Sequence, residues 1–259
     1  EDAGVPMING TRPMLAAVKN ALAWRDYQER SNESPGEADD AVITRWRERL
    51  GTGAMDETQA LAMLGAFGVS VAHSLVCETR EAALQAAGKV GFPVVLKTAM
   101  PEIAHKSDVG GVVVGLTDEA ALSEAYDTMS DALGPRVAVA AMAPRGVEIA
   151  LGMVRDPQFG PMVMVGAGGV LVEVLDDRAF ALAPFGVDHA HRLLDRLKIK
   201  RLLEGMRGAP PADVESLARA ISRFSVMAAA LGDAIAEMDI NPIIAGPHGA
   251  IAVDALVVT

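Results

Sequence analysis

The sequence has little of three features that mark common protein classes. Cys77 is the only cysteine among 259 residues, so the chain can form no intrachain disulfide and no zinc site built on several cysteines. Aromatic residues account for 4%, which leaves Val, Ile, Leu, Ala and Met to form the core. Residues 157–172 lack charge, but prolines and glycines interrupt them, so they do not predict a membrane-spanning helix. We therefore expect no membrane partner and a reducing, cytoplasmic location.

Basic residues are also in the minority. The chain has 23 Lys and Arg residues against 34 Asp and Glu residues, which gives a net charge of −11. Because no basic cluster offsets this charge, we expect no nucleic-acid partner. An anionic nucleotide is still compatible with the sequence if local lysines and a divalent metal ion hold its phosphates.

The residues that are present predict a folded, mixed α/β chain. Hydrophobic residues make up 51% and the mean hydropathy is +0.25, which excludes wholesale disorder. The predicted helices are 13–27, 41–50, 56–67, 79–90, 118–133, 188–197 and 211–231. The predicted strands are 69–76, 94–97, 111–116, 137–142, 147–154, 162–165, 170–174, 235–244 and 250–258. Short loops after two strands indicate antiparallel meanders, so we expect two mixed α/β lobes.

A lysine, Lys97, ends the apolar strand V-V-L-K. Such a lysine can simply extend its side chain into solvent. The next loop favours a functional interpretation, because it is small, polar and glycine-ended and can fold its amides over phosphates. The loop consists of His105, Lys106, Ser107, Asp108, Val109, Gly110 and Gly111. A cation beside such a loop is suited to a triphosphate.

Polar side chains interrupt the apolar strands near the C-terminus. Alternation along a strand places Glu237, Asp239 and Asn241 on one face. Asp254 lies on the next predicted strand, and pairing of the two strands would bring it near Asp239 or Asn241. Oxygen ligands on neighbouring strands suit Mg²⁺ bound with a nucleotide. The alternative is a polar, solvent-facing strand edge, although Asp and Asn are poor strand formers.

Several motifs follow one another between about Leu61 and Ala255. They are G-F-P-V-V-L-K, H-K-S-D-V-G-G-V, G-V-E-I-A-L-G-M-V-R-D-P-Q-F-G-P, V-G-A-G-G-V-L-V-E-V-L, L-L-E-G-M-R-G and D-I-N-P. Together they resemble the ATP-grasp part of NDP-forming (ADP-forming) acyl-CoA synthetases, which are related to the succinyl-CoA synthetase β subunit. The resemblance implies a two-lobed ATP-grasp fold of the mixed α/β class.

The resemblance also implies a role for each matching residue. Lys97 matches the strand lysine that contacts nucleotide phosphates, and His105 matches a histidine implicated in carrying the phosphoryl group. The residues that match the phosphate-side loop beside it are Lys106, Ser107, Gly110 and Gly111.

Further matches imply the remaining parts of a nucleotide site. Met142 lies in the segment 137–143, which matches the hinge strand whose backbone faces adenine. Glu148 matches the acid that holds the ribose hydroxyls. The residues that match the Mg²⁺ site are Asn241 and Asp254, with Asp239 beside them.

The same resemblance divides the chain. Residues 1–53 would be N-terminal helices and a linker, similar to the tail of a preceding CoA-ligase domain, and residues 54–259 the ATP-grasp domain. Its small lobe would span about 76–142 and its large lobe 54–75 with 143–259. A chain that begins with Glu1 rather than Met is then expected to be a C-terminal fragment of a longer enzyme.

The implied reaction is acid + CoA + ATP ⇌ acyl-CoA + ADP + phosphate, through an acyl phosphate and a phosphohistidine. ATP or ADP and Mg²⁺ are the implied cofactors, and CoA is a substrate of the complete enzyme. The implied partner is a CoA-binding (CoA-ligase) part, in the same longer chain or a separate subunit, within an oligomer. We expect the fragment alone to be inactive in the full reaction.

Two alternative functions stay open at this point. One is a non-catalytic ATP-grasp-like regulatory module fused to another enzyme, which Ala140 and Ala181 favour because relatives often carry polar or charged residues there. The other is an ATP-grasp carboxylate–amine ligase. Such a ligase passes an acyl phosphate directly to an amine, so the His105 loop argues against it.

Overall fold

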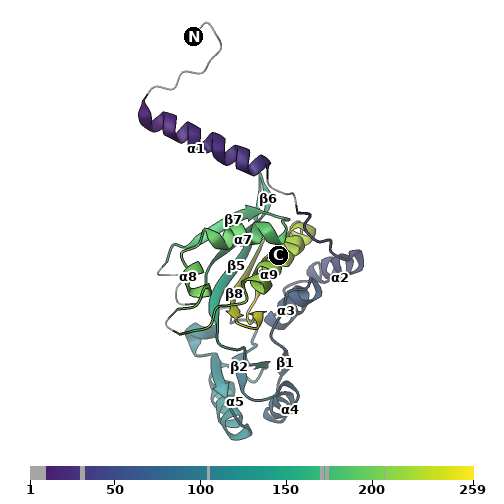
Figure 1. Cartoon of the computed structure of the whole chain (residues 1–259). Helices are drawn as coiled ribbons and strands as arrows, with labels where there is room; N and C mark the ends of the chain where they lie inside the picture. The colour runs from purple at the N-terminus through teal and green to yellow at the C-terminus, as the bar shows by residue number, and fades with distance from the viewer. Residues whose placement is uncertain (1–9, 30–32, 104–105, 170–171, 173–174, 207) are drawn as a thin grey trace. The chain divides into compact units, whose positions relative to one another are not determined.

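Figure 1 shows a computed structural model of the chain, which describes residues 10–29, 33–103, 106–169, 172, 175–206 and 208–259. The contacts divide the chain into two units, Glu1–Ser34 and Pro35–Thr259. Helix α1 (Thr11–Gln28) of the first unit has no buried residue. The second unit holds both β-sheets and positions the candidate site.

The second unit alternates helices and strands. Its helices are α2 (Asp40–Leu50), α3 (Glu57–Ala66), α4 (Arg80–Val90), α5 (Glu119–Leu133), α7 (Val187–Asp195), α8 (Lys200–Leu203) and α9 (Val214–Leu231), with a 3₁₀ turn η1 (Lys106–Val109). Its strands are β1 (Ser74–Cys77), β2 (Val94–Thr98), β3 (Val112–Leu116), β4 (Val137–Ala141), β5 (Val147–Asp156), β6 (Gly160–Ala167), β7 (Arg178–Leu182), β8 (Glu237–Gly246), β9 (Gly249–Ala252) and β10 (Leu256–Val258).

The strands form two sheets, which confirms the predicted two-lobed, mixed α/β fold. A four-stranded sheet has the order β1-β4-β2-β3, and a six-stranded sheet has the order β10-β8-β5-β6-β7 with β9 paired to β8. Neighbouring strands in both sheets are antiparallel, as the predicted meanders required.

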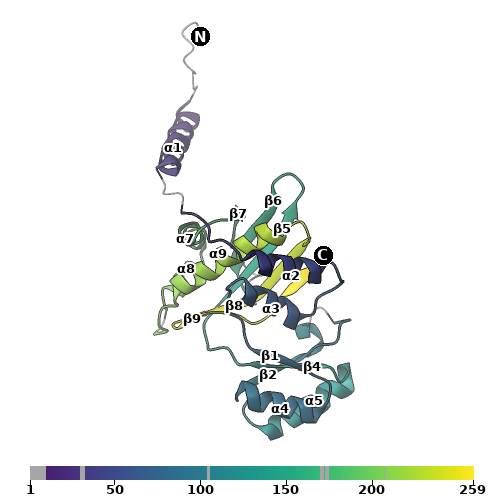
Figure 2. The ribbon, with the colours of Figure 1, turned by 90° about the vertical axis from the view of Figure 1, so that its right-hand side faces the viewer.

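Helices α4 and α5 cover the face of the smaller sheet that is turned away from the larger one (Figure 2). Val94 and Leu96 of β2 and Val139 of β4 are fully buried in the core on that face. Because side chains alternate along a strand, Lys97 points to the opposite face, toward the larger lobe. The alternation of β2 therefore aims a lysine at the junction between the lobes.

Helix α9 lies along one face of the larger sheet, with α2 and α3 nearby (Figure 2). Alternate residues of β5 and β8, such as Leu151 and its register partner Ile240, are fully buried in this core. The residues between them, Glu148 on β5 and Asp239 and Asn241 on β8, point to the other face. The larger sheet thus turns its polar side chains away from its helices.

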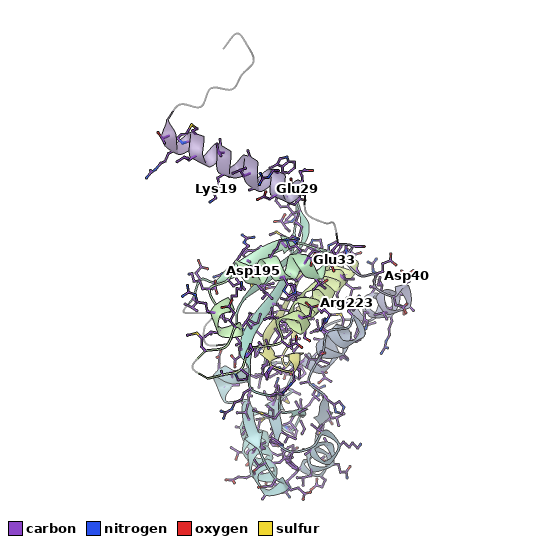
Figure 3. The ribbon with its side chains drawn as sticks, viewed as in Figure 1. Lys19, Glu29, Glu33, Asp40, Asp195 and Arg223 are labelled. Atoms are coloured by element: carbon purple, nitrogen blue, oxygen red, sulfur yellow. The ribbon has the colours of Figure 1, made fainter. Side chains whose placement is uncertain are left out.

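Helix α2 belongs with the second unit. Its Trp46 and Leu50 are buried in the larger core, and Arg223 of α9, labelled in Figure 3, donates from Nη1 to the carbonyl oxygen of Glu37 at 3.4 Å. The contacts divide the chain after Ser34, and the predicted boundary at residue 53 stays a prediction. The assignment of residues 1–53 to the tail of a CoA-ligase domain stays a prediction.

Three predicted strands differ from the structure. The strand predicted at 250–258 is two strands, β9 and β10, which both pair with β8 and leave 253–255 between them unpaired. The strand predicted at 69–76 is reduced to β1, and Val71 before it forms only an isolated bridge with Ala252. The strand predicted at 170–174 lies outside the described residues except Val172, which is helical. Strand β7 was not predicted.

Within the described part of the chain, no helix has the length and apolar character needed to span a membrane.

Phe224, on the inner face of α9, tests the larger core. It is fully buried, so Phe224→Ala is expected to lower the free energy of unfolding by about 3–5 kcal/mol through lost burial and a residual cavity. Urea unfolding measures the change. The matched control is Phe159→Ala, which removes a ring that is 64% exposed and should change stability by no more than about 0.5 kcal/mol. Equal losses in both variants would contradict this account of the core.

Candidate functional site

A buried carboxylate, Glu57, joins two lysines where the lobes meet. Lys97 Nζ donates to Glu57 Oε1 at 2.7 Å, and Lys106 Nζ donates to Glu57 Oε2. The side chains are 9% exposed for Glu57, 7% for Lys97 and 13% for Lys106. The structure thus brings Lys97 and Lys106 together on one carboxylate, which sequence reasoning missed.

The start of α3 places Glu57 at this junction. Asp56 caps the helix by accepting from the backbone N–H of Gln59 at 2.9 Å, and the Gln59 side chain accepts from the N–H of Asp56 at 3.2 Å. This reciprocal capping fixes the first turn. A carboxylate in the first turn also interacts favourably with the positive end of the helix dipole. The apolar side of α3 packs into the larger core, so Glu57 reaches the lysines from the larger lobe.

The unpaired segment between β9 and β10 supplies further oxygens. The carbonyl oxygen of Val253 accepts from Lys97 Nζ at 2.6 Å. Asp254 lies 4.0 Å from Lys97 Nζ and 3.8 Å from Lys106 Nζ. The sequence predicted that Asp254 would approach Asp239 or Asn241, and the structure additionally brings it to both lysines.

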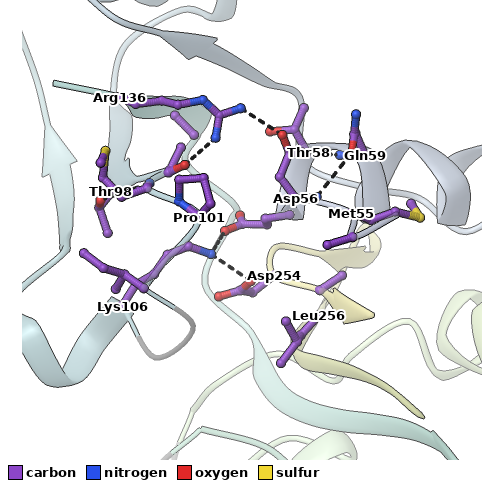
Figure 4. Close-up of a pocket in the computed structure, with 17 residues that line it drawn as sticks. Met55, Asp56, Thr58, Gln59, Thr98, Pro101, Lys106, Arg136, Asp254 and Leu256 are labelled. Atoms are coloured by element: carbon purple, nitrogen blue, oxygen red, sulfur yellow. Dashed lines mark hydrogen bonds and ion pairs between the residues drawn. The ribbon is translucent and has the colours of Figure 1, made fainter. Parts of the chain in front are cut away.

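A cavity of about 310 Å³ adjoins this network (Figure 4). Lys106 and Asp254 line it together with Arg136, which precedes β4. Arg136 donates from Nη2 to Asp56 Oδ2 at 2.9 Å and from Nη1 to the carbonyl oxygen of Ala99. The start of α3 is thus linked to the smaller lobe by Asp56 as well as by Glu57.

A second group of predicted residues meets around Gly169. The Gly169 N–H donates to Asn241 Oδ1 at 3.1 Å. The neighbouring Gly168 N–H donates to the carbonyl oxygen of Glu148 at 2.9 Å. A Cβ at Gly169 would come 1.6 Å from Glu148 Oε2, and its φ of +56° also favours glycine. The structure therefore places Glu148 and Asn241 beside one another, with only room for a glycine between them.

Some charged groups at the junction are stabilised in their ionised form by their neighbours, and others are destabilised. Burial opposes ionisation of Glu57, but Lys97 and Lys106 outweigh it and hold the pKa of Glu57 below its usual value. Burial likewise opposes the charge of Lys106, but Glu57 and Asp254 raise the pKa of that lysine. At neutral pH the network therefore holds an ionised Glu57 and a protonated Lys106.

Ionisation of the other two carboxylates, Asp239 and Asp254, is unfavourable. Burial, followed by repulsion from Asp254 and Glu237, raises the pKa of Asp239. Burial and the nearby Glu57 raise the pKa of Asp254, although Lys97 and Lys106 act against them. A cation placed between Asp239 and Asp254 would relieve this strain.

The number and type of these oxygen ligands determine which metal ion the site could bind. Among the described residues, no three or more His, Cys, Asp or Glu side chains gather as a complete metal site. Mg²⁺ usually takes one or two carboxylates and completes its shell with water and phosphate oxygens. Asp239 and Asp254 fit that requirement, and Asn241 Oδ1 keeps a second lone pair beside the one that Gly169 uses.

The glycines of the predicted phosphate-side loop form hydrogen bonds within that loop. The N–H of Gly111 donates to the carbonyl oxygen of Lys106 at 2.8 Å, and that of Gly110 donates to Ser107 at 3.3 Å. These amides are therefore used within the η1 turn rather than open to phosphates. Met142 is 40% exposed at the end of β4, and His105 lies outside the described residues.

Comparison with known proteins identifies the family. A family described as ATP-grasp domain matches residues 47–259. This chain belongs to the ATP-grasp family. The match includes both sheets and every predicted site residue.

Proteins of similar sequence show to which group within the ATP-grasp family the chain belongs. The β subunit of acetate–CoA ligase (ADP-forming) I from Pyrococcus furiosus is 39% identical over 209 residues, which cover 77% of this chain and 89% of that subunit. Acetate–CoA ligase (ADP-forming) I from Archaeoglobus fulgidus is 38% identical over 192 residues, which cover 71% of this chain and 28% of that protein. Within its family, the chain is the ATP-grasp part of ADP-forming acyl-CoA synthetases.

Comparison with a solved structure supports the same family assignment. Acetyl-coenzyme A synthetase 1 from Ca. Korarchaeum cryptofilum, in complex with coenzyme A and Mg-AMPPCP, matches with a TM-score of 0.71 and 37% identity, over 83% of this chain and 97% of that one. The structural similarity therefore includes the fold of both lobes as well as the sequence.

The strained Asp239 gives a pH-dependent prediction. Because its folded pKa is raised, ionised Asp239 destabilises the protein at neutral pH. This cost fades as the pH falls through the raised pKa toward the ordinary value of 3.8. Asp239→Asn is therefore expected to raise the free energy of unfolding at pH 7, with a gain that shrinks toward pH 3.8. Urea unfolding at a series of pH values measures the difference.

Asp176→Asn is the control, because this carboxylate is 86% exposed and pairs with Arg178 at the surface. It should show no comparable gain at pH 7. An Asp239→Asn protein that is less stable than the wild type at pH 7 would contradict the assigned strain.

Proposed function

We propose that this chain binds a magnesium nucleotide between its lobes and transfers a phosphoryl group between ATP or ADP and histidine. The observation that carries the proposal is the buried network of Lys97, Lys106, Glu57 and Asp254, with Asp239 close enough to repel Asp254. Two lysine side chains beside Asp254, with Asp239 near that carboxylate, offer complementary sites for phosphates and for a cation.

The chain's own side chains perform the positioning in this proposal. Lys97 and Lys106 bind the phosphate oxygens, and Glu148 binds the ribose hydroxyls. When bound, Mg²⁺ neutralises phosphate charge and is held by Asp239, Asn241 and Asp254. Phosphoryl transfer depends mainly on such positioning and charge neutralisation, so no strong general base is required.

The proposal also assigns roles to the segment that binds adenine and to the loop that follows β2. The backbone near Met142, at the end of β4, faces adenine. Ser107, Gly110 and Gly111 bind phosphates once the η1 turn releases its internal hydrogen bonds, and His105 accepts the phosphoryl group. The Ca. Korarchaeum cryptofilum structure is described with a phosphohistidine segment that points towards its nucleotide-binding site, which supports a histidine as the phosphoryl carrier here.

The complete reaction that we propose is acid + CoA + ATP ⇌ acyl-CoA + ADP + phosphate. It requires a CoA-binding partner part, as the division into subunits of the Pyrococcus furiosus relative suggests. In this proposal residues 1–53 connect to that part, residues 54–259 form the ATP-grasp domain, and the complete enzyme is an oligomer. A single, buried and free cysteine, Cys77, supports a cytoplasmic location.

Asp254 provides a test of the metal and nucleotide site. Asp254→Ala is expected to weaken Mg-ADP binding by about tenfold or more, because it removes a ligand of the cation. Calorimetry with Mg-ADP measures the affinity, and titration with ADP in excess EDTA should show a much smaller difference. The control is Asp195→Ala, which removes a surface carboxylate paired with Lys200. Equal affinity of wild type and Asp254→Ala would overturn the metal assignment.

His105 provides a test of the phosphoryl-transfer step. A carrier needs a nucleophilic imidazole nitrogen, which Asn lacks, whereas a phosphate ligand needs only a hydrogen-bond donor, which Asn supplies. In an assay with the CoA-binding part added, His105→Asn and His105→Ala should both lose turnover by orders of magnitude while the Kd for Mg-ADP changes little. Retention of most of the activity by His105→Asn would show that His105 is a ligand rather than a carrier.

A further inference from the structure

Glu57 has no role in the proposed function, although it hydrogen-bonds to both lysines that would bind the phosphates. Its two carboxylate oxygens bind different lysines, Oε1 to Lys97 and Oε2 to Lys106. These lysines come from separate segments, strand β2 and the η1 turn. Glu57 therefore fixes the relative position of two ammonium groups that the backbone does not join directly.

Each lysine keeps a donor for a ligand in this arrangement. Lys97 Nζ donates to Glu57 and to the carbonyl oxygen of Val253, and an ammonium group has three N–H donors. Lys106 Nζ donates to Glu57 and lies 3.8 Å from Asp254, which is too long for a hydrogen bond. Among the described residues, the geometry thus leaves one of the three N–H donors of Lys97 and two of those of Lys106 without a hydrogen-bond acceptor.

Asp254 cannot replace Glu57 as the fixed partner of the lysines. It approaches them only at 3.8–4.0 Å, and its side chain is 33% exposed against 9% for Glu57. In the proposed function Asp254 also turns to the cation. Glu57 is therefore the carboxylate that hydrogen-bonds to both lysines in this structure.

We infer that Glu57 is a positioning residue, which orients Lys97 and Lys106 for the nucleotide phosphates and connects both lysines to the larger lobe through α3. The inference rests on the proposed function and deepens it. Without this carboxylate, two largely desolvated ammonium groups would repel each other and lose their hydrogen bonds to Glu57. Nucleotide affinity should therefore fall even though the removed charge is negative.

A different role for Glu57 would change the nucleotide affinity in the opposite direction. If the Glu57 carboxylate instead occupied the place of a phosphate, it would compete with the nucleotide, and its removal would strengthen binding. The sign of the change in affinity therefore separates a positioning residue from a competing one.

The experiment is calorimetry of the whole chain with Mg-ADP. Glu57→Gln should weaken binding by about tenfold or more, because it breaks a buried, charge-assisted bridge. Glu57→Asp keeps the charge on a shorter side chain and should lie between Glu57→Gln and wild type. Thermal unfolding of each variant identifies the nucleotide-free proteins that remain folded.

A double-mutant cycle shows whether Glu57 acts through the lysines. If it does, Glu57→Gln should have a much smaller effect in a Lys106→Met background than in the wild type. Additive effects would indicate a general structural role and overturn the inference. The matched control is Glu215→Gln, because Glu215 also lies in the first turn of a helix and bridges two partners, His191 and Arg219, at the surface.

The outcomes distinguish the two proposals. No Mg-ADP binding by the wild-type chain would overturn the proposed function together with this inference. Binding by the wild type with equal or tighter binding by Glu57→Gln would overturn the inference alone. Weaker binding by Glu57→Gln, an intermediate Glu57→Asp and a non-additive cycle would establish it.

Discussion

Two lysines lie at the junction of the lobes with little exposure to water, Lys97 buried and Lys106 partly buried, and the surrounding structure depends on the carboxylate placed between them. An unpaired buried ammonium group is costly, because the protein interior does not replace the water it loses. Glu57 compensates both lysines at once, and its own ionisation is favoured by them. The capped start of α3 supplies this carboxylate from the larger lobe, so the same interaction satisfies the lysines and joins the two sheets.

The junction is balanced for a ligand rather than for maximum stability. Lys97 and Lys106 have compensated charges, whereas Asp239 and Asp254 resist ionisation because they are partly buried and near other carboxylates. Strained groups of this kind are often found where a protein binds a charged partner. In the function that we propose, a magnesium nucleotide supplies both a cation for the carboxylates and phosphates for the lysines.

Much of the fold was predictable because its signals are local. Alternation along V-V-L-K aims Lys97 away from the apolar core, and the same rule places Asp239 and Asn241 on one face of β8. Residues 250–258 read as one strand because they are apolar, yet Asp254 interrupts the pairing and leaves β10 as a separate strand. Strand β7 was missed because its R-A-F-A-L sequence alternates small alanines with exposed residues and lacks a strong apolar signal.

Glu57 was not predictable in the same way. It lies 40 residues before Lys97 and reads as an ordinary carboxylate in the first turn of a helix. The available signals were the D-E-T-Q capping pattern, which fixes the first turn, and the need of a buried lysine for an anion. Only the packing of α3 against the larger core connects those signals, and that packing is a tertiary property.

A crystal structure of the chain with Mg-ADP tests the central claim most directly. The account predicts phosphate oxygens within hydrogen-bond distance of Lys97 Nζ and Lys106 Nζ, with Glu57 still bound to both lysines and the metal beside Asp254. A nucleotide bound away from the two lysines, or one whose phosphate displaces Glu57 from them, would contradict it.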